Sequence, residues 1–404
     1  MKLRDLEVFV VGNPPPGFGG RYFIFVKLVT DTGIVGYGEV YAAAVGPIAM
    51  QAVIEDVFAR HMLGQSPDRI EQMFRSTYSA GFTQRPDPTV MGAFSGLEMA
   101  CWDIVGKALN RPIHALLGGQ VNDRLRSYTY LYPTEDQDPL TFYNSAEQSA
   151  ACAARMVDLG FTAVKFDPAG PYTIMGGHQP TMVDIARSVE ICAALREAVG
   201  SRADLLFGTH GQFTTGGALR MAQAIAPYQP LWFEEPVPPD NMAALARVAN
   251  GCALSVATGE RLTTKAEFLP ALQAGATILQ PALGRVGGLW EAKKIAGMAE
   301  AFNAQMAPHL YAGPIEWAAN IQLGASLPNL LMLEQIGTGN PFHQHLLTTP
   351  IHWEDGYVHV PTAPGLGVEL NEDVARAHPY TGTRLHLEMQ ATPHPTAGGL
   401  WAGG

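Results

Sequence analysis

Eight short apolar segments alternate with amphipathic stretches over residues 126–364 of this 404-residue chain. A run of eight strand–helix units is what a closed parallel barrel requires. An open doubly wound sheet would carry a glycine-rich turn such as GxGxxG after its first strand, and no such turn is present there. The sequence therefore predicts an α/β chain with a (β/α)8 TIM-type barrel. The predicted strands are Ser127–Tyr132, Ala163–Phe166, Asp204–Phe207, Leu231–Phe233, Leu254–Ala257, Thr277–Leu279, Ala304–Ala307 and Leu330–Leu333.

Residues 1–125 show a different pattern, in which strands are followed by helices without alternation. Residues 22–30 and 34–41 are rich in β-branched and aromatic residues and flank the turn Asp31-Thr32-Gly33, which predicts a hairpin. Residues 47–62, 67–79 and 89–109 have the spacing of amphipathic helices. We therefore expect an α+β domain over 1–125, a barrel domain over 126–364, and a tail, about 365–404, that packs back on the first domain.

The composition limits the partners of this chain. Its formal net charge of −11 repels nucleic acid phosphates and anionic lipid, which predicts neither nucleic acid nor membrane as a partner. The sequence lacks an apolar run of about 20 residues, and its start, MKLRDLEVFVV, lacks the features of a signal peptide. We therefore predict a cytoplasmic protein.

Polar side chains follow seven of the eight predicted strands. From His210 to Glu334, successive members of this set lie 20–29 residues apart, about one strand–helix unit. In barrels the carboxyl ends of the strands meet at one rim, which is where the chemistry resides. The spacing alone therefore predicts an active site built from Lys165, His210, Glu234, Glu260, Gln280, His309 and Glu334.

Glu234 and Glu260 are predicted metal ligands. Carboxylates on neighbouring strand ends repel each other unless a cation lies between them, and oxygen ligands suit a hard ion such as Mg2+. The alternative is that each acid caps the helix that follows it.

Three rim side chains are candidates for proton transfer. Lys165 and His309 follow strands that face each other across the barrel, so they could address opposite faces of one substrate carbon. His210 could be a general acid or a third metal ligand. The alternatives are a salt bridge between Lys165 and Asp167 or another rim acid, and purely structural roles for both histidines.

Five motifs occur in order along the chain, and together they resemble the mandelate racemase and muconate lactonizing enzyme branch of the enolase superfamily. The resemblance covers about residues 1–370. The motifs are GYGE at 36–39, ACWDIVGKALNRPIHALLGG at 100–119, WFEEP at 232–236, ATGE at 257–260 and ILQPALGRVGG at 278–288.

The resemblance implies a homo-oligomeric, Mg2+-dependent enzyme in which a base removes the proton next to a substrate carboxylate. The ion stabilises the resulting enediolate. The first domain becomes a capping domain whose loops, at 13–21 and around 82–85, close over the barrel mouth. Position by position, Glu234 and Glu260 match two metal ligands, Lys165 matches the first lysine of Lys-x-Lys, His309 matches the histidine after strand seven, and Glu334 matches the acid that binds the substrate carboxylate.

Three positions depart from the pattern of that family. Gly208 stands where a third metal ligand, an aspartate, is usual. Either His210 supplies that ligand, or the site is weak, or no metal binds; an imidazole ligand would shift the preference toward Mn2+ or other transition ions. Ala282 replaces the aspartate that orients the histidine after strand seven, which would leave His309 without a carboxylate partner. Asp167 replaces the second lysine, which argues against two-base racemisation.

The function that we predict is dehydration of a sugar acid to a 2-keto-3-deoxy acid. Lys165 or His309 removes the α-proton, and His210 protonates the departing β-hydroxyl. The alternatives are a racemase, epimerase or cycloisomerase of the same superfamily, or an inactive binding protein, because Gly208 and Ala282 replace expected acids. The side chains predicted to bind a polyol substrate are Tyr130, Asp167, Gln212, Arg261 and Gln280.

Overall fold

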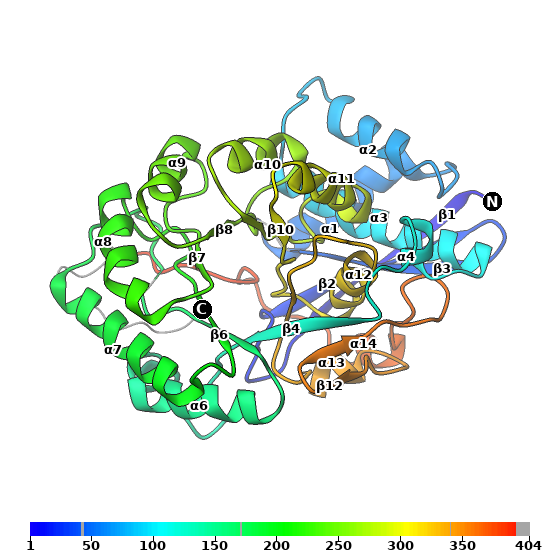
Figure 1. Ribbon diagram of the computed structural model, residues 1–404. Helices are drawn as coiled ribbons and strands as arrows, with labels where there is room; N and C mark the ends of the chain where they lie inside the picture. The colour runs from blue at the N-terminus through cyan, green and yellow to red at the C-terminus, as the bar shows by residue number, and fades with distance from the viewer. Residues whose placement is uncertain (42–43, 170–171, 340, 393–404) are drawn as a thin grey trace.

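A computed structural model of the chain describes residues 1–41, 44–169, 172–339 and 341–392. Eight parallel strands form its central barrel (Figure 1). Strands β4 to β10 pair in chain order, β11 returns to pair with β4, and a bridge from Met306 to Leu330 closes the ring. The predicted (β/α)8 fold is confirmed. The strands are β4 (Arg124–Tyr130), β5 (Ala163–Phe166), β6 (Asp204–Phe207), β7 (Trp232–Glu234), β8 (Val256–Thr258), β9 (Ile278–Leu279), β10 (Gln305–Met306) and β11 (Leu333–Gln335).

Helices connect the barrel strands and lie around them (Figure 1). Several begin with a side-chain cap; for example, Thr181 and Asp184 form a reciprocal capping box at the start of α7. The helices are α5 (Pro139–Asn144), α6 (Ala146–Asp158), α7 (Met182–Val199), α8 (Thr215–Ile225) with the 3-10 turn η2 (Ala226–Tyr228), α9 (Met242–Gly251), α10 (Thr264–Gln273), α11 (Gly288–Ala301), α12 (Pro314–Ala325) and α13 (Pro341–His345).

The barrel interior takes one buried side chain from each strand or from a residue beside it. Large side chains such as Trp232 are mixed with alanines, and together they fill the interior. The polar groups that could do chemistry therefore lie at the rim. The interior side chains are Tyr128, Ala163, Leu206, Trp232, Ala257, Ile278, Ala307 and Met332.

The N-terminal part of the chain is an antiparallel sheet covered by helices. Helix α3 approaches the sheet closely, because a Cβ on Gly38 would lie only 1.8 Å from the carbonyl oxygen of Gly96. Strand β1 was not predicted from the sequence, and the helix predicted over 47–62 divides into α1 and a π-helical turn, η1. The elements are β1 (Leu3–Gly12), β2 (Tyr22–Thr30), β3 (Val35–Val40), α1 (Pro47–Val57), η1 (Phe58–Met62), α2 (Ile70–Ser79), α3 (Pro88–Leu109) and α4 (Ile113–Leu116).

Buried carboxylates join this N-terminal part to the barrel helices. Glu39 accepts hydrogen bonds from the backbone N–H groups of Gly313 (2.5 Å) and Glu316 (2.9 Å), at the start of α12. Glu98 accepts from Leu289 (2.8 Å) at the start of α11. Acids at helix N-termini are favoured by the unpaired N–H groups there. We propose the domain boundary at residue 125, within β4.

The C-terminal segment returns to the N-terminal sheet. Residues 353–359 form a hairpin of β12 (Trp353–Glu354) and β13 (Tyr357–His359), and α14 (Glu372–Ala377) follows. The backbone N–H of Gly12 then donates to His378 O (2.7 Å), and that of Tyr380 donates to Val10 O (2.9 Å). Farther on, Gln390 pairs with the backbone of the loop after β5. Residues 393–404 of the predicted tail lie outside the described residues.

Replacing Glu316 with glutamine is expected to stabilise the protein at pH 8 but not at pH 5. Burial and the charge of Glu316 raise the pKa of Glu39 to about 8, and burial raises the pKa of Glu316 to about 7. Between pH 4.5 and 8 the folded state therefore binds more protons than the unfolded chain, so the free energy of unfolding falls as the pH rises. Glutamine mimics the protonated acid and removes up to about 3 kcal/mol of this penalty at pH 8.

Thermal unfolding at the two pH values measures this effect. The exposed Glu300→Gln is the matched control and should change neither melting temperature. An equal shift for Glu316→Gln at pH 5 and pH 8 would show that the raised pKa is not the cause.

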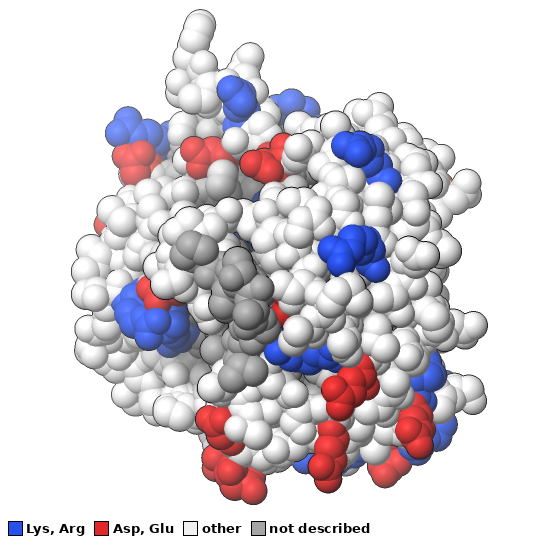
Figure 2. All heavy atoms as spheres, turned by 90° about the vertical axis from the view of Figure 1, so that its left-hand side faces the viewer, with Lys and Arg blue, Asp and Glu red and all other residues white. Residues whose placement is uncertain are grey.

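The described surface carries charges of both signs. On the face drawn in Figure 2, lysine and arginine side chains are interspersed with aspartate and glutamate and separated by wide uncharged areas. No helix among the described residues combines the length and the apolar character that crossing a membrane requires.

Candidate active site

A cavity opens at the carboxyl ends of the barrel strands. It brings together five of the rim side chains predicted from spacing: Lys165, His210, Glu260, His309 and Glu334. The rest of the wall is aromatic and apolar. It consists of Phe18, Tyr41, Tyr130, Tyr132, Tyr143, Tyr172, Tyr311 and Leu387.

Lys165, near the end of β5, is buried and forms an ion pair. Its Nζ lies 2.6 Å from Glu234 Oε1 and 3.6 Å from Glu334 Oε1. Burial alone would lower the pKa of Lys165, but these carboxylates raise it well above its usual value. The salt bridge to a rim acid is therefore present, with Glu234 as the partner in place of Asp167. Lys165 can accept a proton only in its neutral form, and the ion pair with Glu234 opposes that form, so Lys165 has to be separated from Glu234 to act as a base.

Glu234, at the end of β7, lies beneath the cavity and is held from two further sides. Its Oε2 accepts hydrogen bonds from Trp232 Nε1 (3.0 Å) and from Gln280 Nε2 (2.7 Å). Gln280 therefore positions a predicted metal ligand and lies behind the cavity wall.

His309 has carboxylate partners despite Ala282. Its Nδ1 lies 2.9 Å from Glu334 Oε2 and 3.3 Å from Glu260 Oε2. Burial alone would lower the pKa of His309, but the two carboxylates raise it. The expectation that Ala282 leaves His309 without a carboxylate partner is wrong, because the strand that follows supplies Glu334. Lys165 and His309 in turn oppose the effect of burial on Glu334 and lower its pKa to about 2.

His210 follows β6 in a left-handed backbone conformation (φ 48°). Its Nδ1 lies 2.7 Å from Asp167 Oδ2, and its Nε2 lies 3.7 Å from Glu260 Oε1. Burial alone would lower the pKa of His210, but Glu260 and Asp167 raise it to about 9. The ring also packs on Tyr172, with centroids 4.3 Å apart. His210 is thus held in one orientation at the cavity wall, in surroundings that favour its protonated form.

Two of the departures from the family pattern compensate each other in space. A Cβ on Gly208 would lie 3.4 Å from Asp167 Oδ2 and 3.4 Å from Lys165 Cε. In the family pattern an aspartate side chain would extend from position 208. In this chain the carboxylate of Asp167, two residues after Lys165, lies beside that position. A larger residue at 208 would crowd both side chains.

The structure places four of the five predicted substrate-binding residues behind the wall. Of that set, only Tyr130 is among the described residues that line the cavity. Arg261 pairs with Glu235 (Nε to Oε2, 2.8 Å), and Gln212 donates to the carbonyl of His210 (3.2 Å). Direct substrate contacts by Asp167, Gln212, Arg261 and Gln280 remain predictions.

Much of the aromatic wall was not predicted. Tyr132 lies just after β4 and Tyr311 lies in the segment after β10, so a search for aromatic as well as polar residues near the strand ends could have found them. Phe18 comes from the predicted loop 13–21, whereas Phe82 of the second predicted loop is fully exposed. Leu387 comes from the C-terminal segment, and no local sequence signal places it there.

The oxygen atoms at this rim fit a hard cation. Asp167 Oδ1 is buried and accepts no hydrogen bond from the described residues, and the buried Glu260 Oε2 accepts none there either and has His309 Nδ1 as an ion-pair partner at 3.3 Å. Orphaned buried carboxylate oxygens are costly unless a cation or donor meets them. Glu234 can join Glu260 as a ligand if the cation replaces Lys165 at its Oε1.

Both parts of the chain match families of known proteins. Residues 148–374 match the family described as enolase C-terminal domain-like, and residues 18–118 match the mandelate racemase/muconate lactonizing enzyme N-terminal domain.

Several relatives of known name are dehydratases. A D-gluconate dehydratase of Thermoproteus tenax is 33% identical over 94% of this chain and 74% of its own length. A D-galactonate dehydratase of Ralstonia nicotianae is 33% identical over 87% of this chain and 89% of its own length.

A crystal structure of a mandelate racemase/muconate lactonizing enzyme from Sulfitobacter sp. is 65% identical. It superposes with a TM-score of 0.95 over 97% of this chain and 99% of its own.

Proposed function

Because the chain is an enzyme that belongs to the mandelate racemase/muconate lactonizing enzyme branch of the enolase superfamily, we propose that it dehydrates a sugar acid to a 2-keto-3-deoxy acid. Relatives named as dehydratases of D-gluconate and D-galactonate support this substrate class.

One observation carries the proposal: the histidine His210 lines the same cavity as two other side chains that can carry a proton, Lys165 and His309. Elimination of water needs one group that removes the α-proton and another that protonates the leaving hydroxyl. Asp167 fixes the Nδ1 side of His210, which leaves Nε2 to serve as the acid.

The residues divide the reaction between them. Lys165 or His309 takes the α-proton. Glu334 lies next to both of them: its Oε1 faces Lys165 Nζ and its Oε2 faces His309 Nδ1. His210 gives its Nε2 proton to the β-hydroxyl, the C–O bond breaks, and water leaves. The enol that remains becomes the 2-keto acid by taking a proton at carbon 3. Mg2+, held by Glu234 and Glu260, would supply positive charge next to the substrate carboxylate, and Mn2+ would suit the same oxygens.

The aromatic wall suits a polyol chain. Tyrosine rings present apolar faces to C–H groups, and their hydroxyls can donate to or accept from sugar hydroxyls. Tyr130 and its neighbours would therefore select the acid, while the carboxylate end lies at the charged side of the cavity.

Incubation with a library of sugar acids in the presence of Mg2+ tests this function. Formation of a 2-keto-3-deoxy acid, detected as its semicarbazone, is the expected result. Inversion at the α-carbon without loss of water would instead identify a racemase or epimerase. Absence of any reaction over a broad library would favour a binding protein.

Replacing Asp167 with asparagine is expected to lower kcat by at least about tenfold with little change in KM. The amide fills the space beside Gly208 and can still accept from His210 Nδ1, but it lacks the negative charge that favours the protonated imidazole, so the acid step slows while substrate binding persists. Asp240→Asn, on the exposed surface, is the matched control. An unchanged kcat, or a loss confined to KM, would contradict this role for Asp167.

A further inference from the structure

Three potential metal ligands gather on the hairpin of β12 and β13, away from the candidate active site. They are His352, Glu354 and His359, and one ligand atom from each lies within 4.8 Å of the others. In the part of the chain that the structure describes, this is the one such group of three. We propose that these residues form a second metal site, which binds a transition ion such as Zn2+.

The turn of the hairpin fixes the register that brings the ligands together. Asp355 and Gly356 both have positive φ, 48° and 81°, as a two-residue type I′ turn requires. The strands then pair with Trp353 opposite Val358 and Glu354 opposite Tyr357. His352 and His359 come next, and the backbone N–H of His359 donates to His352 O (3.0 Å).

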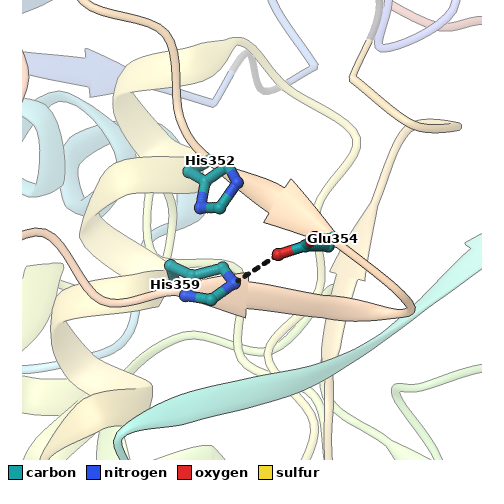
Figure 3. Close-up of side chains that lie close together, drawn as sticks. All are labelled: His352, Glu354 and His359. Atoms are coloured by element: carbon teal, nitrogen blue, oxygen red, sulfur yellow. Dashed lines mark ion pairs between the residues drawn. The ribbon is translucent and has the colours of Figure 1, made fainter.

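This register puts all three side chains on one face. Residues directly opposite each other in an antiparallel pair share a face, and so do residues two apart on one strand. His352 is opposite His359 and two residues before Glu354. In Figure 3 the two imidazoles lie side by side, with ring centroids 4.2 Å apart, and the carboxylate of Glu354 points at His359. The gap from His359 Nε2 to Glu354 Oε2 is 3.7 Å.

The ligand set selects the kind of ion. Two imidazole nitrogens and one carboxylate oxygen suit Zn2+, Cu2+ or Ni2+, whereas Mg2+ prefers oxygen ligands. His352 and Glu354 are exposed, so an ion can enter from solvent and keep water as a further ligand.

The backbone beneath the ligands is already held in place. Strand β13 pairs with β4, and Trp353 Nε1 donates to Ser127 Oγ (2.9 Å). The Trp353 ring also packs on Phe161, with centroids 4.7 Å apart. Binding therefore needs only side-chain adjustment, which keeps its ordering cost low.

The site lies at the opposite end of the barrel from the cavity. Strand β13 pairs with residues 124–126, where β4 begins, whereas the candidate catalytic groups follow the strand ends. A bound ion would cross-link the two sides of the hairpin that covers this end of the barrel. Arg124, opposite His359, lies over the ring of Tyr357 at 4.3 Å, and its charge would limit the affinity.

Titration of the full chain with Zn2+ in excess Mg2+ tests the proposal, since Mg2+ occupies carboxylate sites elsewhere. We expect one Zn2+ equivalent that His352→Ala/His359→Ala loses or binds at least about tenfold more weakly. His345→Ala, which removes another exposed histidine, should bind like the wild type. Glu354→Gln provides a variant that keeps both imidazoles and should weaken binding less.

Electron paramagnetic resonance of bound Cu2+ identifies the ligands directly. Two imidazole nitrogens should appear in the wild type, and each single histidine variant should lose one of them. Equal Zn2+ binding by the wild type and the double variant, or a Cu2+ signal without these nitrogens, would overturn the proposal.

Discussion

Replacing His210 with asparagine is expected to abolish the 2-keto product while exchange of the substrate α-proton with solvent persists. His210 is the oriented acid that donates to the departing hydroxyl, whereas Lys165 and His309 remain in place to remove the α-proton. Loss of a general acid typically costs about 10²–10⁴-fold in rate. Product formation in ordinary water and loss of the α-proton NMR signal in D2O measure the two steps separately.

The control for this variant is His345→Asn, on the exposed side of α13, which should keep both activities. If His210→Asn forms product and exchanges the α-proton near the wild-type rates, His210 is not the acid. Loss of both steps together would point to a role for His210 in binding the ion or the substrate.

The double variant Glu234→Gln/Glu260→Gln is expected to lose all thermal stabilisation by Mg2+ or Mn2+. An ion at about 100 times its Kd stabilises a folded protein by about 2.7 kcal/mol, which the wild type should show as a rise in melting temperature. Neutral amides offer the ion no charge and leave Lys165 without its closest carboxylate partner.

Each variant is compared with itself, with and without the ion, because removing the partner of Lys165 also changes the ion-free stability. The exposed Glu190→Gln is the matched control and should shift as the wild type does. An unchanged ion-dependent shift in the double variant would reject Glu234 and Glu260 as ligands.

The barrel could be predicted because each of its units repeats the same pattern. Every strand, or a residue directly beside it, contributes one side chain to a packed interior, so short apolar segments recur at the length of one strand–helix unit. The ends of the strands were less predictable. β9 and β10 have only two residues each and are shorter than the predicted Thr277–Leu279 and Ala304–Ala307, because only these residues pair regularly with the neighbouring strands.

Two strand segments escaped prediction for different reasons. β1 lies at the start of the chain, where Leu3–Gly12 carries partly exposed residues that blur its alternation. The hairpin of β12 and β13 is short, but its Asp355-Gly356 turn is a known signal for a type I′ connection and could have revealed it.

The rim residues were predictable and their partners were not. Spacing brings Lys165, His210 and His309 to one cavity because parallel strands end at one rim. It does not say that Lys165 pairs with Glu234, that Glu334 serves His309, or that Asp167 fills the space beside Gly208. Such pairings depend on side-chain directions between neighbouring strands, which a linear pattern does not contain.

Deuterium incorporation from D2O tests the central claim most directly, namely that these rim groups remove the proton next to a substrate carboxylate. With Mg2+ and a suitable sugar acid, the account predicts loss of the α-proton and a 2-keto-3-deoxy product that carries solvent deuterium at carbon 3. Retention of the α-proton by every acid of a broad library, with either Mg2+ or Mn2+, would contradict it.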